Sequence, residues 1–197
     1  MQILIGTNNY GKATEISESL SGLELDFITP KDLGIESDPE ETGADFKENA
    51  ILKAKHFNSL SSLPTIADDS GIIVDALQDE LGLHTRRWGA GPEASDEEWI
   101  EYFLDRMKSE PNKKASFICT LAYVDHNNDL HLFEGECHGM ITESLEADYL
   151  PGLPISACFR PEGLTQVFSS LTLDQKNSTS HRGRASQKLR LHLENIN

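Results

Sequence analysis

The sequence predicts an α/β fold whose central sheet mixes parallel and antiparallel strands. Short apolar runs typical of strands alternate with segments whose apolar residues recur at helical spacing. Late in the chain, two apolar runs are separated only by a turn, which is typical of an antiparallel hairpin. No Pro/Gly/Ser-rich linker divides the 197 residues. We therefore expect residues 1–197 to form a single domain.

The first half of the chain alternates between strand and helix patterns. Residues 2–6 form a short apolar run that ends in glycine, and this run predicts a buried strand. The spacing of apolar residues predicts helices over 13–20 and 44–60, and simple alternation predicts a strand over 23–28. Residues 32–43 are acidic and contain Gly and Pro, so we expect a loop there.

The middle of the chain contains a strand signal followed by a strong helix signal. Residues 65–67 are predicted as a strand that ends at the motif Asp68-Asp69-Ser70-Gly71, and an apolar run over 72–77 follows. Ser95 with Glu98 three residues later has the form of a capping box. We therefore expect a helix over 95–108.

The last third predicts a hairpin and a terminal helix. Residues 115–124 alternate as a strand does, 125–129 have the composition of a turn, and 130–136 are the expected hairpin partner. Residues 183–193 are predicted as a helix.

Composition limits the classes of partner. Acidic residues outnumber basic ones 33 to 17, which gives a formal net charge of −16. A nucleic-acid polymer or an anionic membrane calls for a basic surface, so neither is an expected partner. A small phosphorylated ligand remains compatible, because a few local cations and a divalent metal can outweigh a distant negative field.

Cysteine usage and hydropathy predict a soluble cytoplasmic protein. Cys119, Cys137 and Cys158 are widely spaced and include no CxxC pair, so we expect free thiols in a reducing compartment. No apolar segment reaches the length of a signal peptide or a membrane span.

The first motif with chemical potential lies between the first predicted strand and helix. It reads Gly6-Thr7-Asn8-Asn9-Tyr10-Gly11-Lys12. A polar loop that opens a helix presents free backbone N–H groups at the positive end of the helix dipole, which suits an anion. The spacing is not that of a P-loop, and an ordinary turn is the alternative interpretation.

The second motif is the pair Asp68-Asp69. Adjacent side chains on an extended segment point to opposite faces, so the two carboxylates are not expected to share one role. One of them can hold a metal or polarise water, while the other accepts hydrogen bonds from loop backbone. Mg²⁺ fits this composition, and the loop 38–41 can bring a further carboxylate. An acidic turn that caps the next element is the alternative.

The third motif is a cationic cluster from Lys176 to Arg184, just before the last predicted helix. Ser180 is the expected N-cap, which places His181 and Arg182 in the first helical turn. Cations there oppose the helix dipole, so their presence favours a bound anion between them. Arg86-Arg87-Trp88 could also hold phosphate or pair with acidic loops, and no motif for a covalent nucleophile is present.

Taken together, these motifs resemble the inosine triphosphate pyrophosphatase family, whose members hydrolyse deaminated purine nucleoside triphosphates to the monophosphate and pyrophosphate. The resemblance covers nearly the whole chain in order. The matching segments are Thr7-Asn8-Asn9-Tyr10-Gly11-Lys12, Glu41-Thr42-Gly43 with Phe46, Glu48-Asn49-Ala50 with Lys53, Ala67-Asp68-Asp69-Ser70-Gly71, Leu81-Gly82 with Arg87-Trp88, and Lys176-Asn177 with Ser180-His181-Arg182-Gly183-Arg184-Ala185.

The resemblance implies an elongated α/β domain with a central mixed sheet and two lobes around a substrate cleft, and usually a homodimer. It implies that the segment Thr7-Asn8-Asn9-Tyr10-Gly11-Lys12 holds the triphosphate and that Lys53 helps to neutralise it. Asp69 would position Mg²⁺ and activate the attacking water, with Glu41 as a second metal ligand. The residues implied to contact substrate are Ser70, Lys176, His181 and Arg182. Two alternatives remain open, namely the same chemistry on another or broader set of nucleotides, and nucleotide binding without turnover.

One segment departs from the family pattern. The family carries an aromatic-Gly-aromatic-Asp-Pro segment that helps to hold the purine, and the corresponding stretch here is 149–155. With Pro154 as the aligned proline, Leu153 stands in place of the Asp. We therefore expect a narrower preference for deaminated over ordinary purines.

Overall fold

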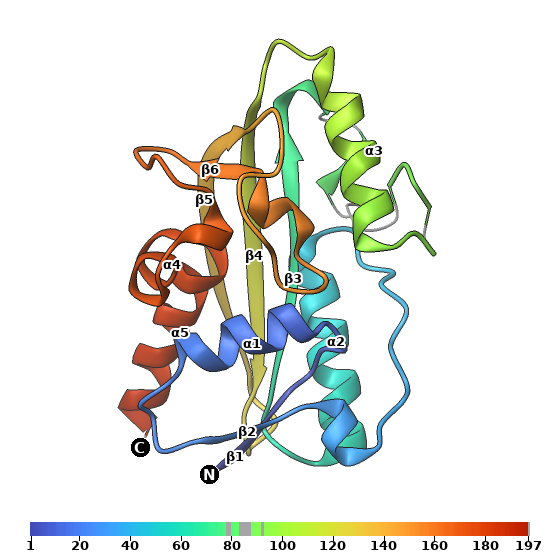
Figure 1. Ribbon diagram of the computed structural model, residues 1–197. Helices are drawn as coiled ribbons and strands as arrows, with labels where there is room; N and C mark the ends of the chain where they lie inside the picture. Colours follow the sequence, from blue (N-terminus) through green and yellow to red (C-terminus); the bar gives the residue numbers. More distant parts are fainter. Residues whose placement is uncertain (78–79, 83–87, 92, 197) are drawn as a thin grey trace.

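One six-stranded mixed sheet runs through the computed structural model, which describes residues 1–77, 80–82, 88–91 and 93–196 (Figure 1). The strand order is β2-β1-β3-β4-β5-β6, and β1 is parallel to both of its neighbours while the later pairs are antiparallel. The mixed sheet predicted from the sequence is therefore confirmed. The strands are β1 (Gln2–Ile5), β2 (Asp26–Ile28), β3 (Thr65–Val74), β4 (Lys114–Val124), β5 (Leu130–Ile141) and β6 (Phe159–Pro161).

Helices lie on both sides of this sheet. Figure 1 shows α4 and α5 on one side of the long strands and α2 on the other. Within the described residues, no helix is both long enough and apolar enough to cross a membrane. The helices are α1 (Tyr10–Ser19), α2 (Phe46–Ser61), α3 (Asp96–Lys108), α4 (Leu173–Thr179) and α5 (His181–Ile196), and short 3₁₀ turns include η2 (Asp75–Leu77) and η4 (Pro154–Ala157).

The two faces of the sheet have different cores, because alternate residues of each strand point to opposite sides. On the face covered by α1 and α5, the core is made of large side chains such as Ile66, Leu121 and Tyr123. On the face covered by α2, the core is built mostly from alanines, including Ala67 and Ala122. Small side chains let α2 pack close to the strands.

A third core lies around α3 at the far end of the strands. Trp99 and Phe103 stack there at a centroid distance of 5.4 Å, and both belong to the same buried cluster as Phe159. The capping box predicted for this helix is confirmed. Ser95 Oγ accepts from the backbone N–H of Glu98, and Glu98 Oε2 accepts from the backbone N–H of Ser95.

Several element boundaries differ from the sequence prediction. The strand predicted to end before Asp68 continues to Val74, because β4 supplies an antiparallel partner for every residue of β3. The strand predicted over 130–136 continues to Ile141 for the same reason. Both α4 and β6 were missed, because seven and three residues are too few for a periodic pattern. Arg86 and Arg87 lie outside the described residues.

Candidate functional site

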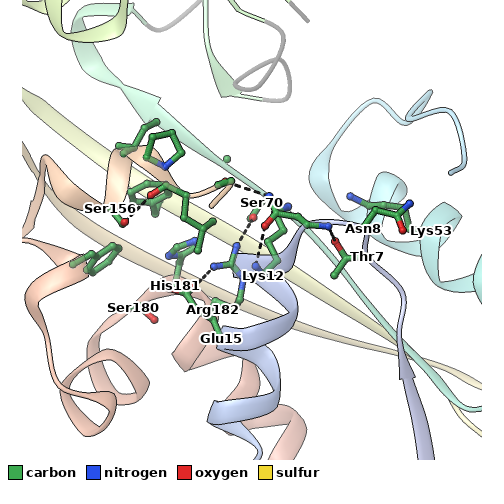
Figure 2. Close-up of a pocket in the computed structure, with 18 of the residues that line it drawn as sticks. Thr7, Asn8, Lys12, Glu15, Lys53, Ser70, Ser156, Ser180, His181 and Arg182 are labelled. Carbon is green, nitrogen blue, oxygen red and sulfur yellow. Dashed lines mark hydrogen bonds and ion pairs between the residues drawn. The ribbon is translucent and has the colours of Figure 1, made fainter. Parts of the chain in front are cut away.

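A cleft of about 530 Å³ brings together residues from distant parts of the chain. The loop before α1, the loop 38–41, the middle of β3 and the start of α5 all contribute to its walls. One end is cationic and the other is aromatic and apolar. Figure 2 shows Lys12, Ser70 and Arg182 converging on one side, with Asn8 and Lys53 set apart from them.

Asp68 is a buried carboxylate held between two cations. Its Oδ1 lies 2.5 Å from Lys12 Nζ, and its Oδ2 accepts a hydrogen bond of 3.1 Å from Arg182 Nε. Ser70 Oγ and Cys119 Sγ donate to the same carboxylate, each at 3.2 Å. Burial opposes ionisation, but the charges of Arg182 and Lys12 hold the pKa of Asp68 well below its usual range. Asp68 is therefore an anion that fixes its two cations.

Glu15 holds Arg182 from its other side and was missed by the sequence motifs. Arg182 Nη1 donates to Glu15, and Lys176 Nζ lies 3.5 Å from the same carboxylate. Arg182 Nη2 also donates to Ser70 Oγ at 2.9 Å. Glu15 follows Lys12 by three residues on α1, and that spacing places both on one helix face. The spacing is the signal that could have indicated it.

Asp69 points to the opposite face of β3, toward α2. Its Oδ1 lies 2.7 Å from Lys53 Nζ, which also contacts Glu41 Oε1 at 3.0 Å. Burial raises the pKa of Asp69 above its ordinary value despite the nearby Lys53 charge. Burial would lower the pKa of Lys53, but Asp69, Asp68 and Glu41 together raise it, so the amine stays protonated. Asp69 is thus a carboxylate whose affinity for a proton is increased.

The donor set at Asp69 fits a hard divalent cation. Within the described ranges, no three His, Cys, Asp or Glu side chains are grouped as a preformed metal site. Asp69 and Glu41 nevertheless converge on one ammonium from different elements, and both offer carboxylate oxygens. Mg²⁺ uses one or two protein carboxylates and completes its shell with phosphate oxygens and water. The residues present therefore fit such an ion when substrate phosphates are also bound.

The apolar end of the cleft is built around His181. Its ring stacks on Phe117 at a centroid distance of 4.6 Å and on Phe168 at 5.9 Å. Burial and the nearby Arg182 charge lower the pKa of His181 well below its ordinary value, so the imidazole is neutral. Trp99 belongs to the same apolar cluster as Phe117 and Phe168 and also lines the cleft. A flat aromatic and apolar surface of this kind suits a planar ring.

The first turn of α5 contains the neutral His181 and the charged Arg182, and a cation at this position opposes the helix dipole. Ser180 Oγ accepts from the backbone N–H of Gly183 at 2.9 Å, so it caps the helix as predicted. His181 and Arg182 do lie in the first turn. The anion expected beside them is supplied by the protein itself, because Asp68 and Glu15 both contact Arg182. The unfavourable helix dipole is thereby offset without a ligand.

The residues predicted for the site fall into three groups. Those whose side chains line the cleft are Thr7, Asn8, Asn9, Lys12, Lys53, Ser70, Glu41, Lys176, His181 and Arg182. Asp69 lies directly behind Lys53 and does not itself line the cleft. Two residues do not line the cleft: Tyr10 is 66% exposed, and Gly11 is buried with Leu153 against it.

Comparison with known proteins identifies a family and several similar proteins. Residues 3–192 match the family model described as the Ham1 family. A dITP/XTP pyrophosphatase of Leptospira interrogans is 43% identical over 188 residues, covering 95% of this chain and 94% of that protein. Another from Treponema denticola is 37% identical over 187 residues, covering 94% of each.

Solved structures agree in fold along the full length. The Ham1 protein of Staphylococcus aureus has a TM-score of 0.81 at 30% identity and covers 100% of both chains. A HAM1 protein from Coxiella burnetii has a TM-score of 0.81 at 31% identity and covers 99% of both chains. On this sequence match and this shared fold, the chain belongs to the Ham1 family.

Proposed function

We propose that this protein hydrolyses deaminated purine nucleoside triphosphates, such as dITP, ITP and XTP, to the nucleoside monophosphate and pyrophosphate. The observation that carries the proposal is the division of the cleft, with cations from α1, α4 and α5 at one end, Lys53 of α2 set apart from them, and stacked aromatic rings at the other end. A triphosphate fits the first end and a purine the second. The relatives named as dITP/XTP pyrophosphatases support the same substrate class.

The cationic end would bind and orient the phosphate chain. Lys12 and Arg182 are held in place by Asp68, and Lys176 by Glu15, before any ligand arrives. Residues already fixed in this way lose little conformational freedom on binding. The N–H groups of Thr7, Asn9 and Lys12 are bonded within residues 5–12, so the other N–H groups of the loop Thr7–Lys12 would supply uncharged donors at the start of α1. Backbone groups can serve this role even at Tyr10 and Gly11.

Asp69 would act on the attacking water. The water oxygen forms a bond to the α-phosphorus, the bond from that phosphorus to the oxygen bridging the β-phosphate breaks, and the water proton passes to Asp69 as pyrophosphate departs. A carboxylate whose pKa is raised by burial accepts a proton more readily at neutral pH. Lys53 would hold the carboxylate in place and face the negative charge of the phosphates.

We assign Asp69 and Glu41 as the metal ligands and Mg²⁺ as the metal, because the family implies a divalent cation in general and both carboxylates meet at Lys53. When bound, such an ion neutralises charge that develops on the phosphate oxygens. Asp38 and Glu40 line the cleft nearby but make no contact with Lys53 comparable to that of Glu41.

We propose that base selection is weaker than a polar pocket allows, because Leu153 lines the cleft where the family's segment carries Asp. An apolar side chain does not distinguish a keto group from an amino group, whereas a charged partner would. Loss of one such contact corresponds to about one to two orders of magnitude in selectivity. We therefore propose that the protein prefers deaminated purines over ordinary purines, but by a smaller factor than a pocket with a charged partner would give.

The remaining properties follow from the surface and the thiols. We propose a homodimer, since strands β4 and β5 expose Met140 and leave Ile118 partly exposed on the face opposite α5.

The net charge of −16 supports a small phosphorylated partner over a nucleic-acid polymer or a membrane. Cys119, Cys137 and Cys158 are buried free thiols, which supports a cytoplasmic location. We propose that residues 1–197 form one functional domain.

The test is a turnover panel with the purified protein. Release of pyrophosphate and of monophosphate would be measured for dITP, XTP, dGTP, ATP and CTP, with Mg²⁺ and with excess EDTA. We expect equal amounts of the two products, a preference for dITP and XTP, and no turnover in EDTA. Release of inorganic phosphate would contradict the proposed bond cleavage. Tight binding of dITP without turnover would identify a nucleotide-binding protein instead.

A further inference from the structure

One glycine in the turn between β5 and η4 is held by side chains from two sides. Asp96 Oδ2 accepts a hydrogen bond of 2.6 Å from the backbone N–H of Gly152. Asn9 Nδ2 donates a hydrogen bond of 3.2 Å to the carbonyl of the same residue. Gly152 has φ +82°, a left-handed conformation that favours glycine. Both polar groups of this residue are therefore bonded to side chains from other elements, more than 50 residues away in sequence.

Asn9 connects this turn to the phosphate end of the cleft. Its Oδ1 accepts from the backbone N–H of Lys12 at 3.0 Å and so caps α1, while its Nδ2 contacts Gly152. The turn also lies directly on α1, since a Cβ added to Gly11 would come within 2.8 Å of the Leu153 side chain. The loop that precedes α1 and the turn are thus packed as one unit.

Asp96 connects the same turn to α3. The N-terminus of that helix is already capped by Ser95 and Glu98, so the Asp96 carboxylate is not needed for the capping box. Trp99 follows Asp96 by three residues on the same helix and lines the aromatic end of the cleft. The pKa of Tyr149 is raised by burial and by Glu97 and Asp96, which agrees with its position beside this acidic turn. Figure 1 shows the orange segment after β5 passing between α1 and α3.

We propose that Asp96 is a positioning residue for the nucleoside half of the substrate. It acts through Gly152: by holding that N–H, it fixes Leu153 and the rest of the turn against α1 and sets the distance between the turn and Trp99 on α3. The proposal rests on the proposed function for the identity of the ligand. It predicts that Asp96 matters for the base and sugar far more than for the phosphates, because Lys12 and Arg182 keep Asp68 as their partner and α1 keeps its Asn9 cap when Asp96 is replaced.

The experiment compares Asp96→Ala and Asp96→Asn with Glu97→Gln. Glu97 lies in the same helical turn and is exposed, so its substitution removes an equivalent charge from the helix N-terminus without touching Gly152. Four quantities are measured: the rate of hydrogen exchange at the Gly152 amide without ligand, kcat for dITP, KM for dITP, and the inhibition constant of inorganic tripolyphosphate. The first does not depend on activity, so it tests the contact even where the proposed substrate is wrong.

We expect Asp96→Ala to speed exchange at Gly152 and to raise the KM for dITP by about tenfold, with kcat changed less than about twofold. Tripolyphosphate inhibition stays as in the wild type. Asp96→Asn keeps an acceptor and gives an intermediate KM, and Glu97→Gln matches the wild type. Equal effects of Glu97→Gln and Asp96→Ala, an unchanged KM in Asp96→Ala, or an equal loss of tripolyphosphate affinity would each overturn the proposal. If Asp96→Ala does not fold, the Asp96→Asn comparison decides alone.

Discussion

Asp68 and Asp69 are adjacent on β3, yet their surroundings differ in almost every respect. Asp68 faces α1 and α5, where Lys12 and Arg182 hold its pKa well below the usual range. Asp69 faces α2, where burial raises its pKa although Lys53 lies 2.7 Å away. The same residue type therefore becomes a fixed anion on one face and a proton acceptor on the other. The alternation of a strand is sufficient to separate the two roles.

The difference shows how one strand can serve both binding and chemistry. Asp68 organises the cations that we propose to bind phosphate, and each of its two carboxylate oxygens contacts one of them. Asp69 shares one lysine with Glu41, and we propose that these two carboxylates hold a metal beside the attacking water. Substitution by the isosteric asparagine should therefore affect different properties: turnover for Asp69 and stability for Asp68.

The largest expected effect is on turnover by Asp69→Asn. An amide cannot accept the water proton and is a weaker metal ligand, so kcat for dITP should fall by about 10²–10⁴-fold. The affinity for a non-hydrolysable dITP analogue should stay within about threefold, since the cationic end is intact. Steady-state kinetics and calorimetric binding check the two quantities. A variant with near wild-type kcat would remove Asp69 from the mechanism.

The second effect is on stability and concerns Asp68→Asn. Removal of the buried charge leaves Lys12 and Arg182 without their shared partner, which typically costs about 3–5 kcal/mol of unfolding free energy. Urea denaturation measures it, with Asp69→Asn as the matched variant on the other face. Added pyrophosphate should restore more stability to Asp68→Asn than to the wild type, because an anion then replaces the missing carboxylate. Equal destabilisation by the two variants would contradict the comparison.

The third effect concerns Lys12, whose side chain is 17% exposed toward the cleft. Lys12→Met keeps the aliphatic stem and removes the charge, so triphosphate affinity should fall by roughly 1.5–3 kcal/mol while nucleoside affinity is unchanged. The control is Lys47→Met, an exposed lysine on α2. Equal losses for nucleoside and triphosphate would show that Lys12 does not contact phosphate.

The smallest expected effect is on the pH dependence of stability. The pKa of His181 is lowered well below 6.5 by burial and by Arg182, so protonation favours the unfolded chain. The neutral His181 therefore makes its full contribution to the unfolding free energy above the pKa that it has in the unfolded chain. This contribution decreases as the pH falls below about 6.5. Between pH 7.5 and 5.5, wild type should lose up to about 1.4 kcal/mol through this group, and His181→Gln should lose less. Substitution of the exposed His126 by Gln serves as the control.

Local patterns predicted the parts of this arrangement that depend on sequence neighbours. Alternation along β3 predicted that Asp68 and Asp69 point apart, and cap chemistry predicted both the start of α3 and the role of Ser180. The parts that depend on distant partners were not predicted. The continuation of β3 through Asp69 and Gly71 requires β4, some fifty residues later, so the apolar run over 72–77 alone did not show that one strand extends from Thr65 to Val74.

Side chains that act through long-range contacts were missed for the same reason. From its local sequence, Glu15 is indistinguishable from any exposed acid on an amphipathic helix. Its role depends on α4 and α5, which bring Lys176 and Arg182 into contact with it. Asp96 looks like one more acid in the first turn of a helix, where such residues are common. Its bond to Gly152 appears only when the turn after β5 is folded beside it.

The most direct test of the division between the two faces is metal binding. Mn²⁺ affinity would be measured by electron paramagnetic resonance for wild type, Asp68→Asn and Asp69→Asn, each below its unfolding temperature and with a non-hydrolysable dITP analogue present. Loss of a carboxylate ligand should weaken Mn²⁺ binding by at least about tenfold in Asp69→Asn. Asp68→Asn should bind Mn²⁺ within about threefold of the wild type, because in the wild type the Asp68 carboxylate is bonded to Lys12, Arg182 and two neutral donors on the other face of β3 from Asp69. Loss of Mn²⁺ from Asp68→Asn with full retention by Asp69→Asn would contradict the account.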